Sequence, residues 1–222
     1  MKLINKLTNG LFTDDKFLYF QTSDKRGENT QYIRYNELNL EAIKMEEYFK
    51  AYYGINYEKI MYYFKDCQAA RTIHKDGSVF VCFYQESVIY KFDRNGSLIR
   101  KYDEMKSIDT IYDIALYENS IWCAYPTSHT IKRYSLEDGN EELTISEGSM
   151  GDDRGTIFCY PESILIQDNT MFVSDMGNKR LCKVDLITLE IENYIELPEQ
   201  IFGYERLGNM EFVMLSSGLY LL

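Results

Sequence analysis

The sequence of 222 residues has few of the features that divide a chain or anchor it in a membrane. It contains 3 prolines and no Pro-rich, Gly/Ser-rich or low-complexity stretch, so we expect one domain over residues 1–222. No apolar run approaches the about 20 residues that cross a bilayer as a helix. The first fifteen residues hold only short apolar runs, which predicts no secretion signal.

Histidine is scarce, and cysteine lacks any paired spacing. The two histidines, His74 and His129, stand far from each other and from any Cys/His pattern that suits zinc, so each is expected to be an isolated side chain. An odd number of isolated cysteines predicts reduced thiols in a cytoplasmic protein, and the abundance of Tyr, Lys, Ile and Asn suits a bacterial source. The five cysteines are Cys67, Cys82, Cys123, Cys159 and Cys182.

Positive charge is also in short supply. The chain has 24 Lys and Arg against 35 Asp and Glu, a formal net charge of −11. Nucleic-acid affinity comes largely from basic residues that neutralise phosphates, and acidic lipid surfaces attract basic segments for the same reason. The composition therefore predicts no nucleic-acid partner and no membrane partner. A protein or peptide partner is expected, with a small molecule as the alternative.

No motif of a known catalytic machine is present. The chain lacks a nucleophile elbow, a phosphate-binding glycine loop and a dinucleotide fingerprint. These absences argue against an enzyme without excluding one.

A repeated pair of strands runs through the chain. Residues 169–174 alternate polar and apolar side chains, residues 175–178 are turn formers, and residues 179–185 form a returning strand. The same pattern recurs without a gap at 77–93 and 119–135, and its parts recur at 15–36 and 209–214. A repeated antiparallel unit of about forty residues is the mark of a β-propeller blade.

The repeat predicts an all-β fold, a propeller of four-stranded antiparallel blades. Five blades are expected, and six is the alternative. The last blade, 198–222, is one strand short, and residues 2–7 have strand composition without a partner, so we expect the N-terminal strand to complete that blade. The interval between the first two return strands is longer than one blade of about forty residues requires. Its excess, 46–65, is either a helical insertion or part of a degenerate extra blade.

The segment 148–185 combines a glycine-rich beginning (Gly151, Gly155) with Pro161 and with the run Val173-Ser174-Asp175, followed by Gly177-Asn178 and Arg180. In these residues it resembles the NHL repeat, a family of propeller blades, and the resemblance covers only this blade. It implies a binding scaffold that recruits proteins; some relatives bind RNA, and a minority of related propellers are metal-dependent lactonases or lyases. In this family Asp175, Asn178 and Arg180 are expected to brace their turn.

Six residues are candidates for ligand contact. The loop Asp152-Asp153-Arg154 leads into the blade at 161, and together with Glu162 its carboxylates are candidate ligands for Ca²⁺, which prefers hard oxygens. In each of the two upstream repeats one residue is equivalent to Glu162. The residues directly after these two are Arg71 and Asp113, and both are expected to line the channel. Because only one blade supplies a carboxylate at the equivalent position, the pattern argues against a central metal hydrolase.

Aromatic residues are abundant, with 20 Tyr and 12 Phe, and the repeat sorts them. Trp122 replaces a phenylalanine of the sister repeats, which predicts a core position. The five tyrosines of the insertion have no equivalents, so they either pack against the blades or form a partner surface; they are Tyr52, Tyr53, Tyr57, Tyr62 and Tyr63.

The sequence therefore predicts a non-enzymatic binding scaffold that recognises a protein or peptide through one face of the propeller. No cofactor is expected, Ca²⁺ aside. The alternative is a propeller that binds a small molecule or a divalent metal, as a lactonase-like or lyase-like enzyme or as a sensor. Carbohydrate binding through exposed aromatics is a third hypothesis.

Overall fold

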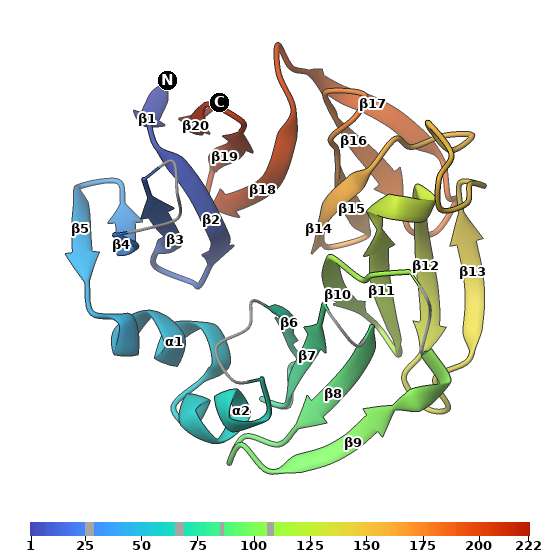
Figure 1. Ribbon diagram of the computed structural model, residues 1–222, viewed down its shortest axis with the longest axis horizontal. Coiled ribbons are helices and arrows are strands. Elements are labelled where there is room, and N and C mark those ends of the chain that lie inside the picture. The colour runs from blue at the N-terminus through green and yellow to red at the C-terminus, as the bar shows by residue number, and fades with distance from the viewer. Residues whose placement is uncertain (25–28, 65–68, 85–86, 106–108) are drawn as a thin grey trace.

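Five four-stranded antiparallel sheets are arranged in a ring in the computed structural model, which describes residues 1–24, 29–64, 69–84, 87–105 and 109–222 (Figure 1). The five-bladed β-propeller is thereby confirmed. No described helix is both long enough and apolar enough to cross a membrane.

Each blade places its strands in chain order from the centre of the ring outwards, apart from the last. Blade 1 contains β2 (Leu7–Thr13), β3 (Leu18–Ser23), β4 (Gln31–Asn36) and β5 (Asn39–Ile43). Blade 2 contains β6 (Ala69–Ile73), β7 (Val79–Phe83), β8 (Val88–Phe92) and β9 (Leu98–Tyr102). Blade 3 contains β10 (Asp113–Tyr117), β11 (Ser120–Tyr125), β12 (Thr130–Ser135) and β13 (Glu141–Ile145).

The remaining two blades follow the same plan. Blade 4 contains β14 (Pro161–Gln167), β15 (Thr170–Asp175), β16 (Arg180–Asp185) and β17 (Ile191–Glu196). Blade 5 contains β18 (Ile201–Leu207), β19 (Met210–Leu215), β20 (Gly218–Leu221) and, on its outer edge, β1 (Lys2–Ile4). The repeated strand pairs of the sequence are the second and third strands of the blades. Short 3₁₀ turns follow blade 2 and β11, at Asp103–Met105 and Pro126–Ser128.

The ring is closed by strands from the two ends of the chain, which lie side by side in Figure 1. Lys2 pairs with Tyr220 and Ile4 with Leu219, so β1 completes blade 5 as predicted. The predicted strand 2–7 is shorter than expected, because the chain leaves blade 5 after Ile4 and Leu7 already begins β2 of blade 1. Pairing the last blade through β1 covers a sheet edge that would otherwise be open.

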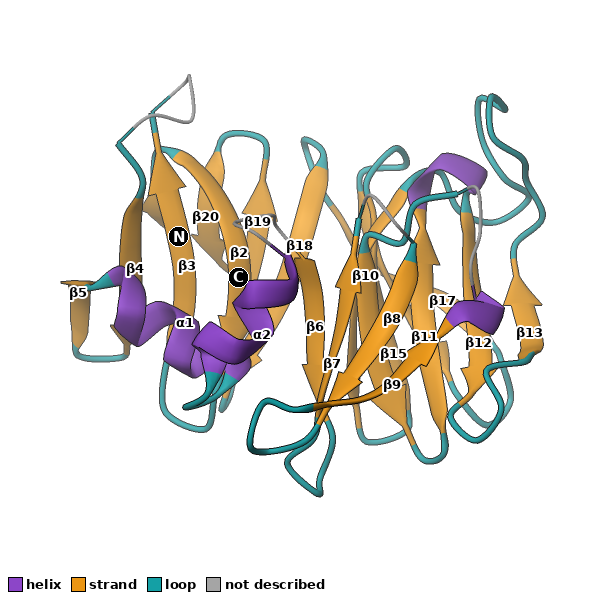
Figure 2. Cartoon of the chain, turned by 60° about the horizontal axis from the view of Figure 1, so that its bottom comes forward, coloured by secondary structure: helices purple, strands orange, loops and turns teal. Residues whose placement is uncertain are grey.

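The insertion between blades 1 and 2 is helical. It forms α1 (Met45–Tyr53) and α2 (Tyr57–Phe64), while Lys65 lies outside the described residues. α1 begins with Glu46 and Glu47 in its first turn and ends at Gly54, whose φ of 89° few other residues adopt. Figure 2 shows both helices against the ring of upright strands. The degenerate extra blade is therefore excluded.

Side chains between neighbouring sheets form the core. The largest cluster between blades 3 and 4 contains Trp122, which is fully buried as predicted, together with Phe158 and Val173. The innermost strands pack against each other from β6 through β10, β14 and β18 to β2, but β2 and β6 do not pack in the same way. At that junction α1 supplies a wedge of aromatic rings.

The wedge consists of Phe12 of β2 and Tyr48 and Tyr52 of α1. The Phe12 ring centroid lies 5.3 Å from that of Tyr48 and 4.9 Å from that of Tyr52, both nearly edge-on. The hydroxyl of Tyr48 donates a hydrogen bond of 2.6 Å to the carbonyl oxygen of Gly10. Gly10 has a φ of 60°, and a Cβ there would lie 2.3 Å from that hydroxyl, so the contact requires glycine.

The tyrosines of the insertion divide between the two roles that the sequence left open. Tyr52, Tyr53 and Tyr57 pack against the blades or the other helix. Tyr62 and Tyr63 are exposed, with 81% and 47% of their surface accessible.

We expect the Tyr48→Phe substitution to lower the free energy of unfolding by about 1 kcal/mol, because it removes one hydrogen bond and leaves the buried ring in place. Urea denaturation followed by tryptophan fluorescence measures the change. Tyr62→Phe is the matched control, since its ring is exposed, and it should change stability by less than about 0.5 kcal/mol. Equal effects of the two substitutions would contradict the role of the Tyr48 bond in joining α1 to blade 1.

Candidate functional site

The innermost strands converge on a cavity of about 400 Å³ at the centre of the ring. Every blade contributes to its wall, and α1 adds Tyr52. This volume lies within the range typical of small-ligand pockets. The polar and aromatic lining residues are Asn9, Tyr52, Tyr84, Tyr112, Asp113, Glu162, Ser163, Phe202, Tyr204 and Glu205.

Three carboxylates from three consecutive inner strands line this cavity: Asp113 of β10, Glu162 of β14 and Glu205 of β18. Asp113 accepts hydrogen bonds of 2.9 Å from the backbone N–H of Ile114 and from that of Ile164 in the next blade. Glu205 accepts a bond of 2.9 Å from the Thr13 hydroxyl of blade 1. These bonds hold two of the carboxylates across blade junctions.

Glu162 differs from the other two carboxylates. Within the described part of the chain it forms neither a hydrogen bond nor an ion pair. A carboxylate can accept several hydrogen bonds through its two oxygens. Glu162 therefore presents unused acceptors to the cavity.

Burial raises the pKa of each of the three carboxylates to about 7. Repulsion from Asp113 adds to the effect at Glu162 and contributes at Glu205. The backbone N–H groups and the Thr13 hydroxyl oppose it at Asp113 and Glu205, because they stabilise the ionised form. The cavity thus concentrates negative charge that the protein itself only partly compensates.

Arg71 of β6 is the cation nearest to this charge. Its guanidinium lies 4.7 Å from the centroid of the Phe12 ring and 4.8 Å from that of Tyr52, within the aromatic wedge. Its charge lowers the pKa of Asp113 and of Glu205, yet it is within ion-pair distance of no described carboxylate. Its Nε is fully enclosed and has no hydrogen-bond partner.

Of the six residues that the sequence singled out, Asp113 and Glu162 line the cavity. Arg71 is not a lining residue, but its guanidinium lies against Tyr52, which is one. Asp152, Asp153 and Arg154 are exposed in the loop between β13 and β14. The carboxylate of Asp152 accepts a bond from the backbone N–H of Ser149, while Glu162 faces the cavity. No set of three metal-ligating side chains forms within the described residues, so the predicted Ca²⁺ ligands are not assembled there.

Glu205 was missed by the sequence reasoning. Only Glu162 stands at the equivalent position, as expected, but carboxylates from three blades line the cavity, because Asp113 and Glu205 reach it from other positions. Glu205 lies further along its strand than Glu162, so an alignment of equivalent positions does not find it. The available signal was an acidic residue inside an otherwise largely apolar inner strand, IFGYERL.

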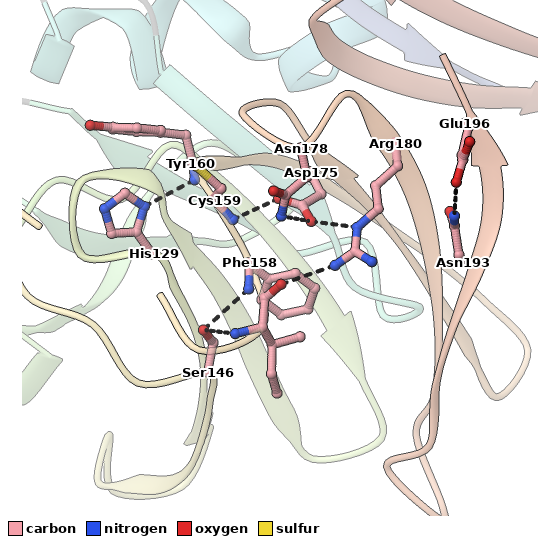
Figure 3. Close-up of polar contacts among 11 residues, drawn as sticks. His129, Ser146, Phe158, Cys159, Tyr160, Asp175, Asn178, Arg180, Asn193 and Glu196 are labelled. Atoms are coloured by element: carbon pink, nitrogen blue, oxygen red, sulfur yellow. Dashed lines mark hydrogen bonds and ion pairs between the residues drawn. The ribbon is translucent and has the colours of Figure 1, made fainter. Parts of the chain in front are cut away.

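Asp175, Asn178 and Arg180 of the NHL-like motif do not line the cavity. They form a brace (Figure 3). Asp175 is fully buried and accepts bonds from the backbone N–H of Cys159, from the Asn178 amide and from Arg180, whose Nε lies 2.8 Å away. Arg180 also donates to the carbonyl oxygen of Ile157. The predicted bracing role of Asp175, Asn178 and Arg180 agrees with these contacts.

The turn of this brace, at residues 175–178, needs its glycine for space and not for a positive φ. The positive φ, 54°, falls on Lys179. Gly177 is required for space, because a Cβ there would lie 2.4 Å from the Cys159 sulfur. Cys159 and the three other described cysteines are free thiols; Cys67 lies outside the described residues.

His129 is buried and fixes the loop 146–160 to blade 3. Its Nδ1 accepts a hydrogen bond of 3.1 Å from the backbone N–H of Tyr160 (Figure 3). Its Nε2 lies 2.8 Å from the carbonyl oxygen of Asp152. The first bond makes Nδ1 an acceptor, so the second requires the proton on Nε2. Both nitrogens are thus used in structure, as expected of an isolated histidine.

Comparison with known proteins supports the fold and nothing finer. No family model matches the chain, and no curated protein does. Solved structures of β-propellers do match. The chain aligns over its whole length with virginiamycin B lyase from Staphylococcus aureus, at 16% identity and a TM-score of 0.52, and covers 72% of that protein.

Two other propellers match equally well. The WD40 propeller domain of Doa1 has 12% identity and a TM-score of 0.54, with 94% of this chain and 60% of that chain covered. A chain of the nidogen/laminin complex has 12% identity and a TM-score of 0.54, with 95% and 73% covered. At identities this low, the structural similarity shows a shared architecture and no shared function, because the same architecture serves unrelated functions.

We expect Asp175→Asn to lower the free energy of unfolding by about 2–3 kcal/mol, because it leaves Arg180 without its counter-ion and weakens a buried set of bonds. Denaturant unfolding measures the loss. Asp168→Asn in the same blade is the control: Asp168 is exposed, and asparagine tolerates its φ of 52°. A loss at Asp175 no larger than that at Asp168 would show that the brace contributes little.

We also expect the melting temperature to fall as pH rises from about 5 to about 8. Carboxylates whose pKa is raised on folding bind more protons in the folded state, so their stabilising effect is complete below the unfolded pKa of about 4 and is lost as pH passes the folded pKa of about 7. Carboxylates with a lowered pKa, such as Asp138 and Glu199, stay ionised throughout this range.

The double variant Glu162→Gln/Glu205→Gln should flatten this pH dependence by at least about 2–4 °C, which corresponds to about 1 kcal/mol in a domain of this size. Glu192→Gln on the outer strand of blade 4 is the control, because that side chain is largely exposed. An unchanged slope in the double variant would mean that the cavity carboxylates are not the groups that titrate.

Proposed function

We propose that the protein is a non-enzymatic binding module that takes a cationic group of a partner protein or peptide into its central cavity. One observation carries the proposal. Three carboxylates from three blades line a cavity of about 400 Å³, and one of them, Glu162, has no partner among the described residues. A cationic group with several N–H donors satisfies both the charge and the unused acceptors.

The lining favours an organic cation over a bare metal ion. The carboxylates share the wall with Tyr52, Tyr84 and Tyr112, and aromatic rings attract ammonium and guanidinium groups. In the part of the chain that is described, no three acidic, His or Cys side chains approach closely enough to ligate one ion. An ammonium or guanidinium group needs no such set of close ligands, because it binds carboxylates through its N–H donors.

Charge and architecture support a protein or peptide as the source of the cation. The net charge of −11 attracts basic partners and speeds their encounter. The same architecture occurs in the nidogen/laminin complex, which is an assembly of two proteins. Nucleic acids and acidic membranes remain disfavoured by the same charge.

A small-molecule enzyme is the second candidate, and the raised pKa values favour it. Groups with a pKa of about 7 are suited to general acid–base catalysis at neutral pH, and Asp113, Glu162 and Glu205 all have such values. Virginiamycin B lyase shares the architecture. This candidate retains a divalent metal as an alternative ligand, at the cavity or at Asp152 and Asp153 of the exposed loop.

Membership of the NHL-like propellers also stays a proposal, supported by the motif at 148–185. A bacterial source is proposed from the composition. A cytoplasmic location is proposed from the free thiols of the described cysteines.

Organic cations should raise the melting temperature of the wild-type protein at about pH 8, where the cavity carboxylates are ionised, because a ligand that binds only the folded state stabilises it. We would titrate cadaverine and agmatine, with 1,5-pentanediol as the neutral counterpart of cadaverine. Glu162→Gln should weaken binding at least about tenfold through the loss of a charge-assisted contact, which corresponds to about 1.4 kcal/mol. Glu192→Gln should not change it.

Ca²⁺, Mg²⁺ and Mn²⁺ form the second arm of the same experiment. A rise with a metal ion, and none with the organic cations, would overturn the binding proposal in favour of the metal-dependent alternative. Proteins retained from a lysate by the wild type and not by Glu162→Gln/Glu205→Gln would identify a partner that uses the cavity. Stabilisation by the neutral diol as strong as that by cadaverine would remove charge as the basis of recognition.

A further inference from the structure

We infer that the ligand is amphoteric: beside its cationic group it carries a carboxylate, which binds Arg71. The inference rests on the proposed function and adds a second contact at the same cavity. The ligand class is a basic amino acid with a free α-carboxylate, either as a free molecule or as the C-terminal residue of a peptide.

The first observation is the state of Arg71. A guanidinium has five N–H donors, and half-buried ones are normally satisfied by acceptors. In the described structure Arg71 donates no hydrogen bond, and its Nε is enclosed without a partner. The contacts that hold it are the faces of Phe12 and Tyr52, which fix the guanidinium and leave its donors unused.

The second observation is that the carboxylates nearby do not supply those acceptors. Arg71 lowers the pKa of Asp113 and of Glu205, so the charges are close enough to interact. Asp113 is nevertheless held by two backbone N–H groups, and Glu205 by Thr13. With both partners anchored elsewhere, the cation and the anions are kept apart around the cavity.

The third observation is the unpartnered carboxylate of Glu162. Glu162 of blade 4 lines the cavity as an anion without a partner among the described residues, and Arg71 of blade 2, a cation without one, lies against Tyr52, which also lines the cavity. A ligand with a single charge leaves one of them unpaired. A ligand that carries both charges, separated by a short aliphatic chain, pairs both, and the site is already organised for it.

The α-carboxylate and side-chain nitrogen of lysine or arginine have this arrangement. A carboxylate also matches the planar fork of a guanidinium, which binds it through two parallel N–H bonds. The volume of about 400 Å³ admits one such residue with room for the chain that precedes it.

Matched ligand pairs test the inference on the wild-type protein by isothermal titration calorimetry. Lysine is compared with cadaverine, and arginine with agmatine; each pair differs only in the α-carboxylate. An acetylated tripeptide that ends in lysine is compared with its C-terminal amide. We expect the carboxylate to strengthen binding at least about tenfold in every pair that reaches the cavity. If the tripeptide with a free C-terminal carboxylate binds tightly and free lysine and arginine do not, the natural ligand is a peptide C-terminus.

Variants of Arg71 locate the effect. Arg71→Met should bring the two members of each pair to equal affinity, and Arg71→Lys should retain part of the preference, because it keeps the charge and loses the fork. Circular dichroism and the melting temperature check that both variants fold, and the comparison on the wild type stands without them.

Cadaverine and agmatine that bind as tightly as their amino acids would overturn the amphoteric ligand and leave the proposed function intact. Failure of all the cationic probes to bind would overturn both. A carboxylate preference that survives in folded Arg71→Met would show that another residue receives the carboxylate, and would overturn the assignment to Arg71.

Discussion

Closure of the ring is the constraint on which the rest of the structure depends. Five sheets stacked face to face have two free ends, and each end exposes apolar surface and strand edges until it meets the other. The chain meets this requirement with two devices. β1 completes blade 5 through its pairing with β20, and α1 fills the junction between β2 and β6 with aromatic rings.

The cavity and its charge follow from closure. Inner strands that surround a centre bring their side chains toward one another, so acidic residues far apart in the sequence become neighbours. Burial raises the pKa of Asp113, Glu162 and Glu205, and the charge of Asp113 adds to the effect at both glutamates. Such an unfavourable arrangement of charges is more typical of a binding site than of a purely structural core, because a ligand can pair with groups that folding leaves without partners.

The repeat made much of the fold predictable from sequence. Alternating strands at 169–174 and returning strands at 179–185 recur, so blade number, strand order and closure all follow from local patterns. The end of the N-terminal strand at Ile4 does not, because residues 5–7 have the same strand composition while the chain passes from one blade to the next. The helical insertion was located by its length, but strand and helix could not be separated for an aromatic segment without alternation.

The site was less predictable than the fold, for a physical reason. Arg71, Asp113 and Glu162 were found because they occupy or adjoin equivalent positions of the repeat. Glu205 occupies a different depth on its strand, and only the curvature of the sheets brings it to the same cavity. The loop Asp152-Asp153-Arg154 looked suitable as a partner of Glu162 because it is near in sequence, yet its residues lie exposed outside the cavity.

The helical insertion also has a consequence for symmetry. A ring of equal blades presents equivalent faces to a ligand at its centre, so a small molecule could adopt several rotated poses of similar energy. Here one junction is unlike the others: Tyr52 and the Arg71 that rests on it occur once, and the carboxylates lie on the other blades. The departure from the repeat therefore removes rotational degeneracy, and it gives the centre of the propeller a direction in which a ligand must be oriented.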